Sequence, residues 1–416
     1  MRTPYGPRPF RLLALRALLI LGLILLTANA KSQTYNVIHV FAGPDGAGPL
    51  AGVVADAAGN LYGTTEGGGT GDCNGFGCGT VFKLTNTNSG WAEQVVHSFQ
   101  GNDGWASYAP VTLDASGNIF ATTGQCISTC NGTAVELTPQ QNGTWSETIL
   151  HSFGGSPDGS GAFSGLLLDA ATGTLYGATE QGGLNSYGTV YMFSGPGYSD
   201  YSSIYSFSGQ SLTSDGYPAF ETLARDAAGN LYGTGGDFLS KGTIFKLSPN
   251  RQGGWTETIL HRFANLEDGA DPIGGVILDA SGNLYGVTYD GGPYNGNYGV
   301  VYKLASNPDG SWTYSVLYAF QGGNDGSFGS AAPAFDASGN LYGTTAYGGN
   351  GYDGTVFKLT PTGQGQWTKT TLHNFRRLDG ALPYASQLWI TSQGTIYGTT
   401  QAGGLFGDGV VFQITQ

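Results

Sequence analysis

Basic residues are scarce in this chain. It carries 16 Lys and Arg against 29 Asp and Glu among 416 residues, a formal net charge of −13 at pH 7. Four of the arginines lie within the first thirty residues, and removing them leaves 12 basic against 29 acidic residues, a net charge of −17. Such a surface repels nucleic-acid phosphates and anionic lipids. We therefore expect no nucleic-acid partner.

Cysteine is also scarce, with four residues in two local pairs, Cys73 with Cys78 and Cys126 with Cys130. Both pairs lie in Gly-rich segments. In an oxidising compartment this spacing favours two small loop disulfides. The alternative is a four-thiolate metal site, although the spacing is not a standard zinc pattern and export would argue against it.

Long hydrophobic runs are limited to residues 12–26, which follow three arginines and precede Ala-Asn-Ala at 28–30. This pattern predicts a signal peptide over residues 1–30, cleaved before Lys31. The alternative is a membrane anchor, but Arg16 leaves an uncharged stretch too short to span a bilayer comfortably. With no cysteine directly after the cleavage site and no hydrophobic C-terminal tail, we expect secretion to the periplasm or outside, without a lipid or C-terminal anchor and without membrane insertion.

What the chain does contain is one phrase repeated seven times. Asp-Ala-Ala-Gly-Asn-Leu-Tyr-Gly, with its turn glycine at Gly59, recurs at intervals of about 56 residues, the spacing of a repeat architecture. The later turn glycines are Gly117, Gly173, Gly229, Gly282, Gly339 and, in a degraded copy, Gly394. No Pro-rich or charged linker interrupts the repeats. The sequence thus predicts one closed repeat domain over residues 31–416.

Each repeat holds four segments rich in β-branched and aromatic residues, separated by turn residues. In the fifth repeat they are 274–278, 284–288, 300–304 and 312–320. A four-stranded sheet with two apolar faces needs a cover on each face, and radial stacking provides it. We expect an all-β fold, a seven-bladed β-propeller of four-stranded antiparallel blades.

The two ends of the chain complement each other. The last repeat stops after its third segment, 410–414, whereas residues 35–41 match the fourth-strand phrase found at 149–153 and 371–375. The N-terminal strand is therefore predicted to complete the last blade and close the ring.

The phrases Gly-Asn-Leu-Tyr-Gly-Thr-Thr, Gly-Gly, Gly-Thr-Val-Phe-Lys-Leu and Leu-His-Ser-Phe follow one another in this order. They resemble the GloVer tandem repeat of exported bacterial proteins, and the resemblance covers nearly all of the chain after residue 30. The resemblance implies a β-propeller-like fold and no particular reaction.

The histidines share one repeat position, two residues before a phenylalanine in the fourth strand, and Tyr205 and Tyr318 fill it elsewhere. Period two would place Trp145, Ile149, His151 and Phe153 on one face. Exchange of His with Tyr indicates a buried donor that meets a fixed acceptor, so a packing role is favoured over catalysis. The recurring tryptophans, interpreted as blade core, are Trp91, Trp145, Trp255, Trp312 and Trp367.

An Asp-Gly pair follows each fourth strand, at Asp45, Asp103, Asp158, Asp215, Asp268, Asp325 and Asp379. Asp-Gly favours a tight bend, which is the structural interpretation. The functional one is a ring of carboxylates for calcium or a cationic ligand, on the face that also carries the variable loops such as 66–79 and 290–299. No single loop has the spacing of a dedicated calcium site.

Three further sets of residues either depart from the repeat or recur in its turns. Trp105 and Trp389 break the tryptophan pattern, and either could stack on a sugar ring. Arg225 is the one charge in a first-strand position that is otherwise apolar, and it marks either a single-site function or an ion pair with a nearby acid. The turn aspartates are predicted to cap their turns: Asp56, Asp114, Asp169, Asp226, Asp279 and Asp336.

These patterns favour an exported binding or scaffold module, most simply a monomer, that holds an extracellular glycan or a surface protein on its loop-bearing rim. The alternative is a polysaccharide lyase or hydrolase that uses rim carboxylates. Its nearest candidates are Glu66, Asp72, Glu180, Asp237 and Asp290. A structural repeat without any small ligand is the third possibility.

Overall fold

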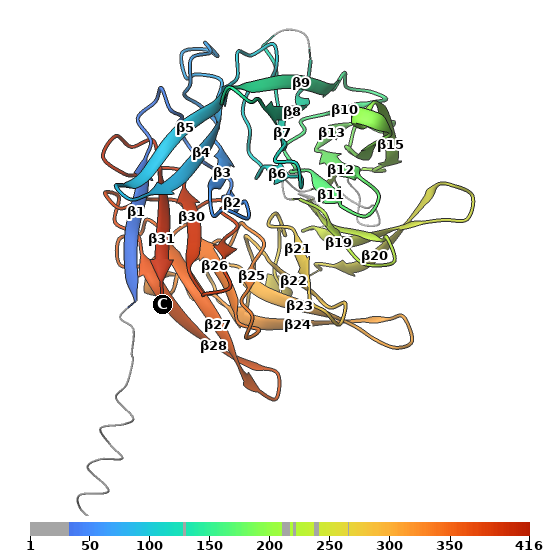
Figure 1. Cartoon of the computed structure of the whole chain (residues 1–416). Helices are drawn as coiled ribbons and strands as arrows, with labels where there is room; N and C mark the ends of the chain where they lie inside the picture. The colour runs from blue at the N-terminus through green and yellow to red at the C-terminus, as the bar shows by residue number, and fades with distance from the viewer. Residues whose placement is uncertain (1–32, 128–129, 210–216, 219–221, 237–240, 265) are drawn as a thin grey trace, which may run out of the picture.

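The structure is a computed structural model that describes residues 33–127, 130–209, 217–218, 222–236, 241–264 and 266–416. Seven antiparallel sheets are arranged radially around a central axis (Figure 1). The predicted all-β, seven-bladed propeller is confirmed. The predicted signal peptide, residues 1–30, lies outside the described residues. Within the described ranges, no helix has both the length and the apolar character needed to cross a membrane.

The blades follow the repeats, and in blades 1 to 6 the four strands of each blade lie side by side in chain order. Blade 1 contains β2 (Val54–Ala55), β3 (Leu61–Thr64), β4 (Thr80–Thr87) and β5 (Gly90–Ser98). Blade 2 contains β6 (Thr112–Leu113), β7 (Ile119–Thr123), β8 (Thr133–Pro139) and β9 (Trp145–Ser152). Blade 3 contains β11 (Leu167–Asp169), β12 (Thr174–Thr179), β14 (Thr189–Ser194) and β15 (Asp200–Ser206). Blade 4 contains β17 (Ala224–Arg225), β18 (Leu231–Gly236), β19 (Thr243–Pro249) and β20 (Trp255–Arg262). Blade 5 contains β21 (Val276–Leu278), β22 (Leu284–Val287), β23 (Val300–Ser306) and β24 (Trp312–Ala319). Blade 6 contains β25 (Ala334–Phe335), β26 (Leu341–Thr345), β27 (Thr355–Gly363) and β28 (Gln366–Asn374).

Short elements decorate the connections between these strands. They are the pair β10 (Gly159–Ser160) with β13 (Gln181–Gly182), the strand β16 (Tyr217–Pro218) paired with β18, and the 3-10 turns η1 (Pro196–Tyr198), η2 (Leu266–Asp268) and η3 (Gly323–Asp325).

The seventh blade joins the two ends of the chain. It contains β29 (Trp389–Ile390), β30 (Ile396–Thr400) and β31 (Val410–Thr415), with β1 (Thr34–Val40) as its outer strand. The strands β1 and β31 are antiparallel, with Tyr35 opposite Ile414, and lie side by side in blue and red in Figure 1. The predicted closure of the ring by the N-terminal strand is confirmed.

The core is divided into seven hydrophobic clusters, one for each contact between neighbouring blades. The cluster between blades 7 and 1, for example, contains the buried residues Phe41, Val53, Phe82 and Val411. Each blade covers its neighbour, as a sheet with two apolar faces requires.

The turn between the first two strands is built as predicted. In blade 1 the Oδ1 atom of Asp56 accepts the backbone N–H groups of Ala58 and Asn60, while its Oδ2 atom accepts the Asn60 amide and the Tyr62 hydroxyl. Gly59 has a φ of +82°, which favours glycine. The same bonds recur at Asp226, Asp279 and Asp336, so the capping role of these aspartates is confirmed.

The outer strand of every blade contains a β-bulge one residue before the His or Tyr position. In blade 2, His151 lies opposite Ala134 and Ile149 opposite Val135, so Leu150 is the extra residue. Equivalent register shifts occur in the other six outer strands. A bulge redirects the side chains that follow it.

Because of this bulge, one prediction is wrong: Trp145 and His151 were expected on the same face of the blade. Trp145 packs against the core shared with blade 1, whereas His151 stacks on Tyr201 of blade 3. The two side chains thus lie on opposite faces of the blade, and the expectation that they share one face was wrong. An unbroken period of two could not anticipate the extra residue.

Both predicted disulfides are formed. Cys73 bonds to Cys78 and Cys126 to Cys130, with Cα–Cα distances of 5.1 and 5.3 Å. The pairing leaves no thiolates for the alternative four-cysteine metal site.

Candidate functional site

Each histidine lies beside the aspartate of its own Asp-Gly pair, and in four of the five pairs the two side chains share a hydrogen bond. The His Nε2 to carboxylate distance is 3.0 Å for both His39–Asp45 and His97–Asp103, and 2.9 Å for His151–Asp158. The corresponding distances are 3.4 Å for His261–Asp268 and 3.1 Å for His373–Asp379. Where tyrosine replaces histidine, the Tyr318 hydroxyl donates to Asp325 at 2.8 Å. The predicted buried donor is thus the histidine or tyrosine, and its fixed acceptor is the aspartate of the Asp-Gly pair. The sequence had indicated these aspartates as bend residues or as a ring of carboxylates, not as partners of the histidines.

The Asp-Gly pairs also shape the bend. The Oδ1 atom of Asp103 accepts the Gln100 backbone N–H at 2.7 Å, and Gly104, with a φ of +140°, packs so close to Thr123 that a Cβ would overlap it. Five of the seven aspartates accept such a backbone N–H bond within their own blade, Asp268 lies 3.4 Å from His261, and Asp215 lies outside the described residues. Binding of calcium or a cationic ligand by these carboxylates stays a prediction.

The residue four positions before each histidine or tyrosine lies over the preceding blade. Three of these residues are tyrosines whose rings stack on histidines: Tyr35 on His373, Tyr201 on His151 and Tyr314 on His261, at centroid distances of 3.7, 3.8 and 4.0 Å. Facing a tyrosine instead, Lys369 pairs with Asp325 at 2.9 Å and Glu257 accepts the Tyr205 hydroxyl at 3.1 Å. The side chain at this position therefore matches the chemistry of the blade before it.

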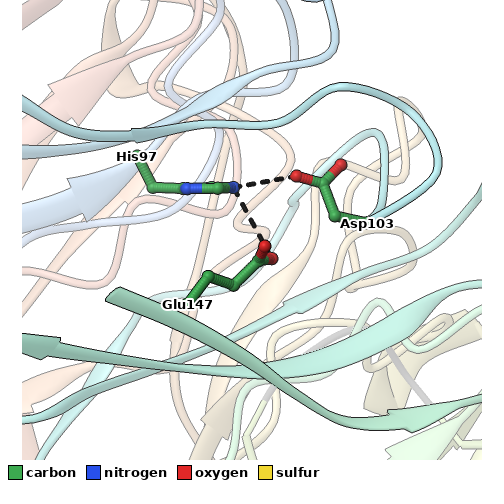
Figure 2. A group of neighbouring side chains, drawn as sticks. All are labelled: His97, Asp103 and Glu147. Carbon is green, nitrogen blue, oxygen red and sulfur yellow. Dashed lines mark hydrogen bonds and ion pairs between the residues drawn. The ribbon is translucent and has the colours of Figure 1, made fainter. Parts of the chain in front are cut away.

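Two blade contacts carry a glutamate over a His–Asp pair. Glu147 of β9 places its Oε1 atom 3.6 Å from His97 Nε2, beside Asp103 (Figure 2). Burial raises the pKa of Glu147, as does the nearby Asp103, while His97 lowers it. Burial and Asp45 raise the pKa of Glu93 to about 7. A proton or a cation would relieve the repulsion between carboxylates at both contacts.

A central hollow opens on the loop-bearing face. Its volume is about 350 Å³, and it is lined by loops from blades on opposite sides of the ring. Five of its lining residues stand five positions after an Asp-Gly aspartate: Leu50, Tyr108, Ile273, Ser330 and Tyr384. Tyr347 and Gln401 add polar groups from two of the variable loops. None of these residues was predicted, although a repeat position that holds mostly apolar and aromatic side chains could have indicated them.

Glu66 lines this central hollow and a second one. The second hollow has a volume of about 340 Å³ and is lined by Glu66, Phe76, Trp105 and small residues of blade 1. The Tyr108 hydroxyl donates to Glu66 Oε1 at 3.0 Å, and the Tyr108 ring stacks on Phe163. Phe76 is 78% exposed, at the tip of the loop closed by the Cys73–Cys78 disulfide. We call the two hollows together the Glu66 groove.

Other predicted candidates lie elsewhere. Arg225 pairs with Asp169 in the turn of the preceding blade at 2.9 Å, so its charge meets a nearby acid. Trp389, at 37% exposure, lines a separate hollow with Val53 and Pro110. Burial raises the pKa of both Glu180 and Asp290, and neither residue lines the Glu66 groove. Asp72 accepts the Gly75 backbone N–H, and Asp237 lies outside the described residues.

The fold and its hollowed loop face define a repeat β-propeller. The family described as the Gloeobacter/Verrucomicrobia repeat matches residues 24–237 and 235–416, and the chain belongs to it. No curated protein sequence matches the chain. Among solved structures, the chain is similar to an ancestral GH74 enzyme, with a TM-score of 0.52 and 13% identity over 89% of this chain. The chain spans about half, 51%, of that structure, and the likeness concerns the fold alone.

Proposed function

We propose that this protein is an exported glycan-binding module and that the Glu66 groove is its binding site. Aromatic rings can stack on the apolar faces of sugar rings, and a carboxylate accepts hydrogen bonds from sugar hydroxyls. Ligand sites combine such apolar surfaces with a few polar groups in a concave setting. The strongly acidic chain favours a neutral or cationic glycan over a sulfated or uronic one.

One observation carries this proposal: a single carboxylate, Glu66, is shared by two hollows that each present aromatic side chains. Tyr108 and Tyr384 line the central hollow, while Trp105 and Phe76 line the second. This spacing of aromatic surfaces suits a chain of several sugar units better than a single monosaccharide. In this proposal Trp105 stacks on a sugar ring, Phe76 provides a second aromatic surface, and Glu66 accepts hydrogen bonds from the sugar hydroxyls.

A glycan array followed by calorimetry on residues 31–416 tests the proposal. We expect Trp105→Ala and Tyr108→Ala each to weaken binding of the selected glycan by about 3- to 10-fold, the worth of one aromatic contact. Glu66→Gln keeps the shape and removes the charge, and we expect a loss of about 10-fold. Phe406→Ala is the matched control, because Phe406 is 60% exposed and lines neither hollow.

Binding that none of the three groove variants weakens would refute the proposal, as would a protein ligand captured with unchanged affinity by all of them. The same samples decide the enzymatic alternative. Release of oligosaccharides from a bound polysaccharide, abolished in Glu66→Gln, would replace binding with hydrolysis or elimination.

A further inference from the structure

Three side chains that can ligate a metal meet where blade 2 covers blade 1. His97 lies on β5, Asp103 lies in the bend that follows β5, and Glu147 extends from β9 of the next blade (Figure 2). His97 Nε2 lies 3.0 Å from Asp103 Oδ2 and 3.6 Å from Glu147 Oε1. The three ligand atoms all lie within 4.8 Å of one another, and no other group of three or more such residues is found in the described part of the chain.

These separations fit a tetrahedral ion. Ligands at zinc–nitrogen and zinc–oxygen bond lengths stand about 3.4 Å apart in a tetrahedral site. The Glu147 side chain is 22% exposed, and a water molecule would be the fourth ligand of such an ion.

One of the three ligands, Asp103, is also held in position. Asp103 Oδ1 accepts the Gln100 backbone N–H at 2.7 Å, so this carboxylate is oriented by a second contact, as ligands of metal sites usually are. Glu147 Oε1 is buried and has no hydrogen-bond partner among the described residues, although it points at His97. A buried carboxylate oxygen without a donor is costly unless a cation or a proton reaches it.

The repeats provide an internal comparison. At the equivalent contact between blades 2 and 3, Tyr201 takes the place of Glu147, stacks on His151 and donates to Asp158 at 2.5 Å. That contact is satisfied by the protein alone. The contact between blades 1 and 2 keeps the His–Asp pair but has a second carboxylate in place of the neutral ring, so it carries one more carboxylate than its sister contact.

We propose that His97, Asp103 and Glu147 bind one divalent transition-metal ion, with zinc as the best match to the ligand set. An imidazole with two carboxylates suits zinc, whereas calcium prefers a larger number of oxygen ligands. The ion would link the outer strands of blades 1 and 2. This site is separate from the Glu66 groove, and its test does not depend on glycan binding.

Zinc titration of chelator-treated protein, residues 31–416, tests the site by calorimetry and by competition with a chromophoric chelator. We expect one equivalent of zinc to bind, with little binding of calcium, and saturating zinc to raise the Tm by about 3 °C. Cobalt should give the visible absorption of a tetrahedral ion.

Glu147→Gln is the decisive variant, and Glu257→Gln, at the same repeat position in blade 4, is its matched control. We expect Glu147→Gln to weaken zinc binding at least 10-fold while the metal-free protein keeps its Tm, and Glu257→Gln to leave zinc binding unchanged. Failure to bind one equivalent of zinc, or equal affinity in wild type and Glu147→Gln, would overturn the proposal. A Glu147→Tyr variant, which copies the sister contact, should fold and lose the site.

Discussion

The closure of the ring can be tested at Tyr35, the residue of the N-terminal strand that packs against blade 6. Its ring stacks on His373 at 3.7 Å, touches Phe375 edge-on at 6.0 Å, and its hydroxyl donates to the Asp379 carbonyl at 2.5 Å. Removal of a large aromatic side chain from a core costs about 3–5 kcal/mol. Because Tyr35 is half-buried, we expect Tyr35→Ala to lower the free energy of unfolding by about 3 kcal/mol.

The expected loss in the free energy of unfolding has separate contributions from the ring and from the hydroxyl of Tyr35. Tyr35→Phe keeps the stacked ring and removes only the hydrogen bond, so about 1 kcal/mol should be lost. The stacked pair contributes about another 1 kcal/mol beyond the area that it buries. Urea unfolding followed by tryptophan fluorescence measures both variants, with m-values checked for constancy.

Two matched positions make the result decisive. Tyr201 and Tyr314 occupy the same repeat position at contacts that do not involve the chain ends, and both stack on a histidine. If the ring is closed by β1, Tyr35→Ala should cost about as much as Tyr201→Ala and Tyr314→Ala. A loss below about 0.5 kcal/mol for Tyr35→Ala, beside full losses for the other two, would refute closure by the N-terminal strand.

Three further predictions follow from individual contacts. Burial and Asp45 raise the pKa of Glu93 in the folded state to about 7, above its unfolded value, so the free energy of unfolding should fall as pH rises from about 4.5 to about 7. Glu93→Gln should remove this pH dependence. At pH 8 the variant should be more stable by about 1 kcal/mol in urea titrations, a figure reduced for solvent screening of this half-exposed group. Replacing Cys73 and Cys78 with serine should cost about 2 kcal/mol and weaken glycan binding through the loosened loop, and an unchanged glycan affinity would separate that loop from the groove. Arg225→Met should cost about 2 kcal/mol in thermal unfolding because it removes the cation beside the buried Asp169, and it should leave glycan affinity unchanged.

The sequence by itself determined the architecture, because the relevant interactions are local and repeat with the chain. Six turns with an aspartate and a seventh with Thr391 in its place set the number of blades, and Asp56 shows that such a turn is built from residues within six positions. The missing fourth strand after Val410–Thr415 and the spare one at Thr34–Val40 predicted the closure. The disulfides followed from short spacing alone.

Only the tertiary structure decided which side chains meet across blades. The extra residue at Leu150 turns His151 toward the next blade, and a period of two cannot reveal such an insertion. The meeting of Glu147 with His97, and of Glu66 with Tyr108, joins residues about 50 and 42 positions apart through the radial packing of separate sheets. Strand periodicity fixes the face on which a residue lies, but the height and tilt of one blade against the next determine its partner. For that reason the candidate groove and the candidate metal site emerged from the fold, while the fold itself emerged from the repeat.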